Sequence, residues 1–223
     1  MGGLRITVPE HSKVAIVIPC YNEAMTIEAV VRGAVPFGQV FVIEDGSTDG
    51  SQELSTAAGA TVVPTSGRQR YEGAIEQGLR HAYDLGYDFV VTLDADGEHD
   101  PHIVEEFVKQ RVSGADLVLG IRAAPQRLAE WIVCFYCRRR FGVSDILCGM
   151  KGYSNPVLAT YFAQTQSNLT NTWPALLWIA KNGTFEQVDV TGTPRIDTPR
   201  FNSLVRANLK IAAMLGPIFK LRG

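Results

Sequence analysis

The chain has 223 residues, of which 46% are hydrophobic and 20% charged, and this balance excludes disordered and fibrous proteins. Its length suits one domain with a substantial buried core. Lysine and arginine total 21 against 23 aspartate and glutamate, so a net charge of −2 gives no electrostatic attraction for nucleic acid.

The first half of the sequence alternates short apolar runs with helical patterns. Val14–Ile18 ends at Pro19, as a buried parallel strand would. Further strands are predicted at 40–43, 60–63, 89–93 and 116–120, and helices at 23–35, 51–58, 71–85 and from Pro101 onward. Strands and helices that alternate at this spacing predict an α/β domain with a mainly parallel sheet.

The second half has a different texture. An aromatic helix is predicted at 127–141, where it ends in three arginines, and helices at 171–182 and 203–215 flank a strand at 184–190. No internal repeat or linker separates the halves. We therefore expect a single domain with a nucleotide-binding half over about 12–122 and a specificity half over about 123–223.

Membrane-span and secretory signals and the spacing of the cysteines together predict the cellular compartment. No apolar run reaches the 18 residues of a membrane span, and the polar first 13 residues do not resemble a secretory signal. The four cysteines show no disulfide spacing, and the Cys134–Cys137 pair lies in an aromatic helix without a turn glycine. We expect a cytoplasmic protein with buried free thiols rather than a zinc or redox site.

Polar clusters follow four of the predicted strands. They are Tyr21-Asn22-Glu23, Glu44-Asp45, Asp94-Ala95-Asp96 and Arg122. Each cluster alone could be a helix cap or a solvated loop, but ligands of parallel sheets bind beyond the carboxyl ends of the strands. Close carboxylates repel by about 1–4 kcal/mol per pair, and a divalent cation removes that cost. The pattern predicts an acidic bowl in which Mg²⁺ or Mn²⁺ holds a substrate diphosphate.

Three stretches, Val14–Glu23, Val42–Ser51 and Thr92–Pro101, resemble in order and spacing the signatures of family-2 glycosyltransferases with the GT-A fold. Within that family the chain is most similar to polyprenyl-phosphate glycosyltransferases of the dolichyl-phosphate mannose synthase type. The resemblance is good over about the first 150 residues and loose beyond them. It implies a Rossmann-like, nucleotide-diphospho-sugar transferase domain with a mainly parallel central sheet flanked by helices.

The resemblance also implies roles for individual residues. Tyr21, Glu23 and Asp45 would contact the base and ribose of a nucleotide sugar, with Pro19 in the same motif. Asp94 would hold the ribose or sugar, Asp96 and Glu98 the metal, and Arg122 a phosphate. Asp145 is the candidate general base, and Arg195 or Arg200 would supply the cation that binds the diphosphate. His99 and His102 are expected to be solvated at a helix start.

Departures from the family pattern fall mostly in the second half. Lys151 in Cys148-Gly-Met-Lys151 replaces an arginine, Asn171 stands where a glutamate is expected, and the basic loop reads Arg195-Ile-Asp-Thr-Pro-Arg200. The residues expected to bind the donor match the family pattern, whereas the resemblance does not identify the acceptor of this chain.

We therefore expect a metal-dependent, inverting glycosyltransferase that uses a nucleotide-diphosphate sugar, with a GDP-sugar favoured, and transfers to a polyprenyl phosphate or a small molecule. A nucleotide-sugar mutase or isomerase without a separate acceptor is the alternative, and a non-catalytic nucleotide-sugar binding protein is a third reading.

The C-terminal stretch Ser203–Arg222 places apolar residues near one side and basic residues beside them. It could contact membrane lipids peripherally, or it could be a helix packed on the domain with a solvated basic face.

Overall fold

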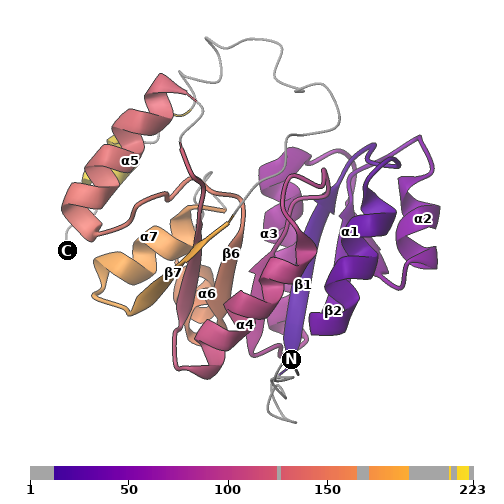
Figure 1. The fold of residues 1–223 in the computed structure, drawn as a ribbon, viewed down its shortest axis with the longest axis horizontal. Helices are drawn as coiled ribbons and strands as arrows, with labels where there is room; N and C mark the ends of the chain where they lie inside the picture. Colours follow the sequence, from indigo (N-terminus) through magenta and orange to yellow (C-terminus); the bar gives the residue numbers. More distant parts are fainter. Residues whose placement is uncertain (1–12, 125–126, 165–170, 191–210, 212–214, 221–223) are drawn as a thin grey trace, which may run out of the picture.

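The structure, a computed structural model, describes residues 13–124, 127–164, 171–190, 211 and 215–220. Its centre is one seven-stranded sheet with the order β3-β2-β1-β4-β6-β5-β7 (Figure 1). The strands are β1 (Val14–Cys20), β2 (Gln39–Glu44), β3 (Thr61–Pro64), β4 (Phe89–Thr92), β5 (Leu117–Ile121), β6 (Lys151–Ser154) and β7 (Phe185–Asp189). Only β6 runs antiparallel to its neighbours, so the sheet is mainly parallel, as predicted.

The helices cover both faces of this sheet. They are α1 (Ile27–Ala34), α2 (Ser51–Ala57), α3 (Arg70–Asp84), α4 (Val104–Val112), α5 (Leu128–Phe141), α6 (Asn155–Phe162), α7 (Trp173–Ala180) and α9 (Leu215–Lys220). Short 3-10 turns at Val35–Phe37 and Pro101–Ile103 extend α1 and precede α4. The predicted alternation of strands and helices in the first half is confirmed, although α1 begins at Ile27 rather than at residue 23.

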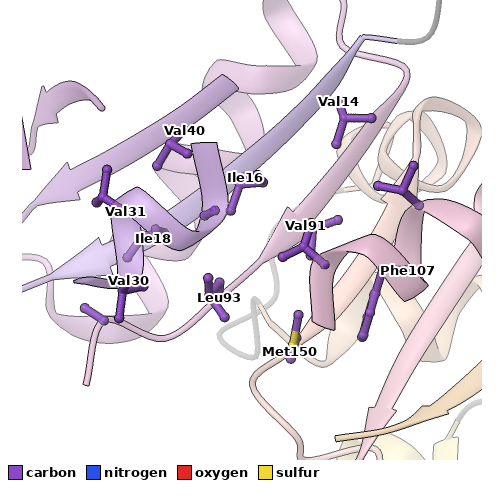
Figure 2. Close-up of a cluster of buried hydrophobic side chains, with 14 of the residues drawn as sticks. Val14, Ile16, Ile18, Val30, Val31, Val40, Val91, Leu93, Phe107 and Met150 are labelled. Carbon is purple, nitrogen blue, oxygen red and sulfur yellow. The ribbon is translucent and has the colours of Figure 1, made fainter. Parts of the chain in front are cut away.

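Two apolar cores lie on opposite faces of the sheet. Alternate residues of β1 divide between them, because successive strand side chains point to opposite faces. Ile16 and Ile18 pack with Val30 and Val31 of α1 and with Phe107 of α4 in the first core (Figure 2). The second core joins the other face of the sheet to α3, α5, α6 and α7.

The strand β6 and the helix α6 were not predicted from the sequence. The four residues of β6, Lys-Gly-Tyr-Ser, are all buried, yet they contain neither an apolar run nor an alternating pattern. Their pairing supplies the reason for the strand, because β6 fills the gap between β4 and β5. As β6 is antiparallel, its first residue, Lys151, lies opposite Thr92 at the carboxyl end of β4.

Candidate functional site

Two loops at the carboxyl ends of β1 and β2 are bonded to each other. The backbone N–H of Asn22 donates to Ser47 Oγ at 2.9 Å. The backbone N–H of Glu23 donates to Ser51 Oγ at 2.8 Å. Asn22 has a φ of 52°, in the left-handed region that asparagine enters more readily than most residues. These contacts fix the backbone at Asn22 and Glu23, directly after Tyr21.

Asp45, a predicted nucleotide contact, orders a third loop. Its carboxylate is buried and accepts backbone N–H bonds from Gln69 at 2.6 Å and from Arg70 at 2.8 Å. The same loop carries Arg68, whose guanidinium lies 3.6 Å from the centroid of the Tyr21 ring. Asp45 therefore holds the loop that places a cation on Tyr21, and a direct contact between Asp45 and a nucleotide stays a prediction.

Glu44 is a candidate that the sequence analysis did not assign. This side chain is 4% exposed, and its Oε1 accepts a hydrogen bond from the backbone N–H of Ser47. Its Oε2 is buried and has no hydrogen-bond partner among the described residues. An unsatisfied buried oxygen is costly, so this atom is suited to accept a bond from a ligand hydroxyl. Its place as the last residue of β2 was the available signal.

Asp94 lies beyond β4 and is held from the opposite side of the site. Its Oδ1 accepts a hydrogen bond from the Tyr71 hydroxyl of α3 at 3.0 Å. Its Oδ2 lies over Gly149, where an added Cβ would come within 2.4 Å of that oxygen and 3.0 Å of the Tyr71 hydroxyl. Gly149 is therefore required by close approach, since any side chain there would displace the carboxylate.

Asn171, which stands where a glutamate was expected, belongs to the same cluster. Its Nδ2 donates to the Tyr71 hydroxyl and to the Gly149 carbonyl, both at 3.1 Å. Its backbone N–H donates to Glu72 Oε2 at 3.2 Å, and its carbonyl accepts from the Tyr153 hydroxyl at 2.7 Å. Asn171 thus ties the segment before α7 to the Asp94 side of the site through neutral donors.

The charge of Asp94 is perturbed by its surroundings. Burial and the neighbouring carboxylate of Asp96 raise the pKa of Asp94, while His99, Tyr71 and Lys151 act in the opposite direction. Asp96 accepts the backbone N–H of Glu98 at 3.1 Å, which folds the segment after β4 back on itself. Acidic groups at alternate positions are therefore brought together here, as the sequence predicted.

The predicted metal residues, Asp96 and Glu98, supply two carboxylates at this turn. Within the ranges that the structure describes, no group of three or more His, Cys, Asp or Glu side chains could hold a metal ion. Mg²⁺ is commonly bound through one or two carboxylates, substrate phosphates and water. The oxygen donors present fit that mode of binding, and the metal site stays a prediction.

The two histidines of this region differ from each other. His102 is exposed, as expected, and pairs with Asp100 at 2.9 Å. His99 was expected to be solvated, and this prediction is wrong because its side chain is 5% exposed. Its Nδ1 has no hydrogen-bond partner among the described residues. His99 is therefore part of the wall of the site next to Asp94.

Arg122 and Asp145 form an ion pair rather than two separate ligand contacts. Arg122 Nε lies 2.7 Å from Asp145 Oδ2, and Arg122 Nη2 lies 3.1 Å from Asp145 Oδ1. Although burial opposes ionisation, the hydrogen bonds and charge of Arg122 lower the pKa of Asp145. A carboxylate with both oxygens bonded to a guanidinium is a poor proton acceptor. This arrangement argues against Asp145 as a general base.

Glu130 extends this ion pair into a network that anchors α5. Its Oε1 accepts from Arg127 Nη1 at 2.8 Å, and its Oε2 lies 3.4 Å from Arg122 Nη2. Glu130 and Asp145 are both 4% exposed, so the network is largely shielded from water. Arg122 joins the end of β5 to the first turn of α5, and its contact with a phosphate stays a prediction.

Lys151 is a buried cation that the sequence analysis noted only as a departure. The side chain is 1% exposed, and its ammonium donates to the Cys148 carbonyl. Burial lowers the pKa of Lys151, while Cys148, Asp145 and Glu72 raise it. Its positive charge acts to lower the pKa of both Asp94 and Asp145. No strand was predicted at Lys151, so nothing indicated that its side chain would point into the molecule.

The four cysteines are free and buried, as predicted. Burial raises the pKa of each thiol, to about 12 for Cys20, Cys134 and Cys137 and about 11 for Cys148. They therefore remain protonated at neutral pH and pack as small apolar groups. The predicted diphosphate contacts Arg195 and Arg200, and most of Ser203–Arg222, lie outside the described residues.

Comparisons with known proteins agree with this arrangement. The sequence model of the family described as Glycosyl transferase family 2 matches residues 15–129. Undecaprenyl-phosphate mannosyltransferase of Micrococcus luteus is 30% identical over 161 residues, which cover 63% of this chain and 66% of that protein. Polyprenol monophosphomannose synthase of Mycolicibacterium smegmatis is 26% identical over 82% of this chain and 78% of its own length. The matched stretch spans 39% to 50% of two further relatives.

Solved structures give the same fold. Glucosyl-3-phosphoglycerate synthase of Mycobacterium tuberculosis, crystallised with Mn²⁺, UDP and phosphoglyceric acid, superposes with a TM-score of 0.78 over 97% of this chain and 81% of that one. The sequences are 20% identical, so this likeness establishes the fold alone. Together with the family match over the three acidic loops, it identifies the chain as a member of glycosyl transferase family 2 with the GT-A fold.

Proposed function

We propose that this chain transfers a sugar from a nucleotide-diphosphate sugar to a polyprenyl phosphate. The observation that carries the acceptor class is the pairing of Asp145 with Arg122 through both carboxylate oxygens. An alcohol acceptor needs a general base, whereas a phosphate acceptor is already anionic at neutral pH. A site whose predicted base is neutralised by a guanidinium suits the phosphate, and the names of two relatives refer to polyprenyl or undecaprenyl phosphate.

The transfer itself is a single displacement. An oxygen of the acceptor phosphate forms a bond to the anomeric carbon while the bond from that carbon to the diphosphate breaks. The electron pair of the broken bond leaves with the nucleoside diphosphate, and the configuration at the anomeric carbon inverts. No proton has to be removed from the acceptor in this step, so the transfer requires no general base.

The described residues divide the donor between them. Tyr21, Glu23 and Glu44 lie at the ends of β1 and β2 and would receive the base and ribose, with Asp45 positioning the Arg68 loop. Asp94 would hold the sugar or ribose hydroxyls in the orientation set by Tyr71. The ammonium of Lys151 is close enough to act electrostatically on Asp94, and it offsets part of the negative charge there.

A divalent cation, Mg²⁺ or Mn²⁺, is part of the proposal. When bound, such an ion would neutralise the charge that develops on the departing diphosphate. Asp96 and Glu98 are the residues that would hold it, and Arg195 or Arg200 would approach the same phosphates. The related fold crystallised with Mn²⁺ and UDP gives the precedent for this pairing of ion and diphosphate.

The finer prediction of a GDP-linked donor rests on the likeness to the mannose synthase type. Isothermal titration of the purified chain with GDP, UDP and dTDP, with and without Mn²⁺, measures this preference. We expect GDP to bind more tightly than UDP or dTDP. In Asp96→Asn the increase in nucleotide affinity that Mn²⁺ produces should be lost. Asp100→Asn is the matched control, because it changes an exposed carboxylate at the same turn.

The activity is tested by incubating the chain with Mn²⁺, candidate nucleotide sugars and undecaprenyl phosphate, followed by mass spectrometry of the lipid fraction. We expect a lipid-linked sugar and one nucleoside diphosphate per transfer. A rearranged nucleotide sugar formed without acceptor would instead establish the mutase alternative, to which relatives named as transferases and synthases give no support.

A further inference from the structure

The outward face of α5 is apolar. Leu128, Trp131, Ile132 and Phe135 are 76%, 57%, 52% and 67% exposed, and their spacing of three and four residues places them on one stripe of the helix. Figure 1 shows α5 at the periphery of the molecule. We name these four residues the α5 stripe.

The stripe is not a by-product of burying the other side of the helix. Ala129, Val133, Cys134 and Cys137 are buried and already supply an inward apolar face. A helix packed on a soluble domain ordinarily carries polar residues opposite such a face. Here the first two turns are apolar all round, apart from Glu130, which is bonded to Arg122 and Arg127. Contiguous exposed apolar surface of this kind indicates an interaction site.

The last turn of α5 adds positive charge to the stripe. Arg138, Arg139 and Arg140 are all exposed, and no salt bridge among the described residues joins any of them to a carboxylate. Arg139 continues the stripe itself, four residues after Phe135. Phe219 of α9, 57% exposed, lies beside this turn with its ring 4.5 Å from that of Tyr136. Apolar and aromatic residues are thus followed by a cluster of unneutralised cations.

We propose that the α5 stripe docks on an anionic lipid bilayer, with its apolar side chains in the interface and Arg138–Arg140 on the phosphate headgroups. Interfacial helices combine tryptophan, phenylalanine and leucine on one face with basic residues that reach anionic headgroups. A second copy pairing through the same stripe would offer no exposed carboxylate of α5 to neutralise these arginines, because Glu130, the one acidic residue of α5, is buried, whereas an anionic membrane neutralises them. The charge therefore favours the bilayer as the occupant.

The position of α5 relative to the site gives this surface a consequence. The Arg122–Glu130 and Arg122–Asp145 contacts fix the first turn of α5 to the end of β5, at the same edge of the sheet as Asp94. A molecule docked through the stripe would hold that edge next to the bilayer, where a lipid-linked acceptor resides. The stretch Ser203–Arg222, for which either a peripheral membrane contact or packing on the domain was expected, contributes Phe219 beside the last turn of α5, and most of the rest lies outside the described residues.

Vesicle flotation tests the proposal without donor or acceptor, so its outcome is independent of the proposed transferase activity. The full chain is mixed with vesicles of phosphatidylcholine alone or with 30% phosphatidylglycerol, a mixture for which about one third of the lipid is anionic by design. We expect binding to the anionic vesicles that weakens with salt. Trp131→Ser with Phe135→Ser should reduce it at least tenfold, and replacing Arg138–Arg140 by glutamine should reduce it about 100-fold, at roughly fivefold per charge.

The matched control is Leu85→Ser with Val112→Ser, which removes two comparably exposed apolar side chains, 52% and 47%, at the ends of α3 and α4. This variant should float like the unaltered chain. Circular dichroism melting checks that all variants are folded. Brominated lipids add a positional measurement, because they should quench the fluorescence of Trp131. In Trp131→Phe the fluorescence of the remaining tryptophans should not be quenched.

Three results would overturn the proposal. The unaltered chain could fail to float with anionic vesicles, or the stripe variants could float as well as the control. Analytical ultracentrifugation could instead reveal a dimer that Trp131→Ser with Phe135→Ser converts to monomer, which would assign the stripe to a second copy. In each case the transferase proposal would stand or fall on its own assay.

Discussion

The loops after β1, β2 and β4 use their carboxylates differently from the segment after β5. Asp45 and Asp94 accept hydrogen bonds from backbone amides and a tyrosine hydroxyl, which orient the carboxylates without cancelling their charge. Asp145 and Glu130 instead pair with Arg122 and Arg127. We call these the donor loops and the arginine network. The difference teaches that acidic residues gathered at one sheet edge are not equivalent, since only the donor loops keep negative charge for a ligand.

Breaking the arginine network should give the largest effect, and it should be on stability. In Asp145→Asn the half-buried Arg122 loses the closer of its two charged partners, and breaking a buried pair of this kind costs about 3–5 kcal/mol. For a chain of this size each kcal/mol lowers the melting temperature by roughly 2–4 °C. Thermal denaturation measures the shift, and Asp84→Asn, an exposed carboxylate on α3, is the control that should not move.

The same pair has a defined pH dependence. Because the folded pKa of Asp145 lies below its ordinary value of 3.8, the unfolded chain binds the proton more readily. The stabilisation is therefore complete above pH 3.8 and lost as the pH falls through the folded pKa. The difference between the chain and Asp145→Asn should shrink over that interval. A variant with unchanged stability and abolished transfer would restore Asp145 as a catalytic base.

Changing the donor loops should affect activity more than stability. In Gly149→Ala the new Cβ would lie 2.4 Å from Asp94 Oδ2, so the carboxylate must move. A displacement of about 1 Å at a reacting site can cost on the order of 100-fold in rate. Steady-state kinetics should show this loss in kcat/KM. Gly216→Ala, whose added Cβ has no atom of the described residues within 4 Å, should keep full activity.

Tyr71→Phe should cause a smaller loss of activity in the donor loops. It removes the hydroxyl that donates to Asp94 and accepts from Asn171, while the ring remains. The loss of one hydrogen bond to a charged group is worth about 1.5–3 kcal/mol, so kcat/KM should fall at least tenfold. Tyr83→Phe, on the same helix with its ring against Phe162, is the matched control. Equal activity of the two variants would show that Asp94 does not depend on Tyr71.

Changing Lys151 should give the smallest effect, which is a change in how the free energy of unfolding varies with pH. Burial lowers the pKa of Lys151 below 10.5, so between its folded pKa and 10.5 the unfolded chain binds more protons. This group alone therefore makes the free energy of unfolding rise with pH in that window, whereas the four buried thiols, with raised pKa values, make it fall. The difference in free energy of unfolding between the chain and Lys151→Met isolates the contribution of Lys151 and should rise with pH, as measured by urea denaturation at several alkaline pH values. A difference that does not change with pH would mean that Lys151 keeps its ordinary pKa in the folded chain.

Sequence patterns were sufficient where one physical rule determines the outcome. Apolar runs predicted β1 to β5, and the rule that parallel strands end at a common edge placed Asp45, Asp94 and Arg122 at the same edge of the sheet. The patterns failed where a residue acts against its type. β6 holds a lysine and a glycine in full burial because two neighbouring strands need a partner, and no local signal in four residues reports that need.

Contacts between side chains far apart in the sequence were also not predicted from sequence patterns. Asp145 was predicted to be a base because of its motif, yet its role depends on Arg122, 23 residues away in sequence. His99 was expected in solvent because it precedes a helix start, whereas tertiary packing buries it. The aromatic content of α5 was noted from the sequence, but which of its apolar residues face outward followed only from the packed structure.

A comparison of two acceptors measures whether a site whose predicted base is paired with arginine requires an anionic acceptor. Undecaprenyl phosphate and undecaprenol are supplied separately with the preferred nucleotide sugar, Mn²⁺ and the full chain, and the glycosylated lipid is quantified. We expect transfer to the phosphate and none above background to the alcohol. Comparable transfer to undecaprenol would contradict the account, because it would require a general base that this site does not use for a phosphate.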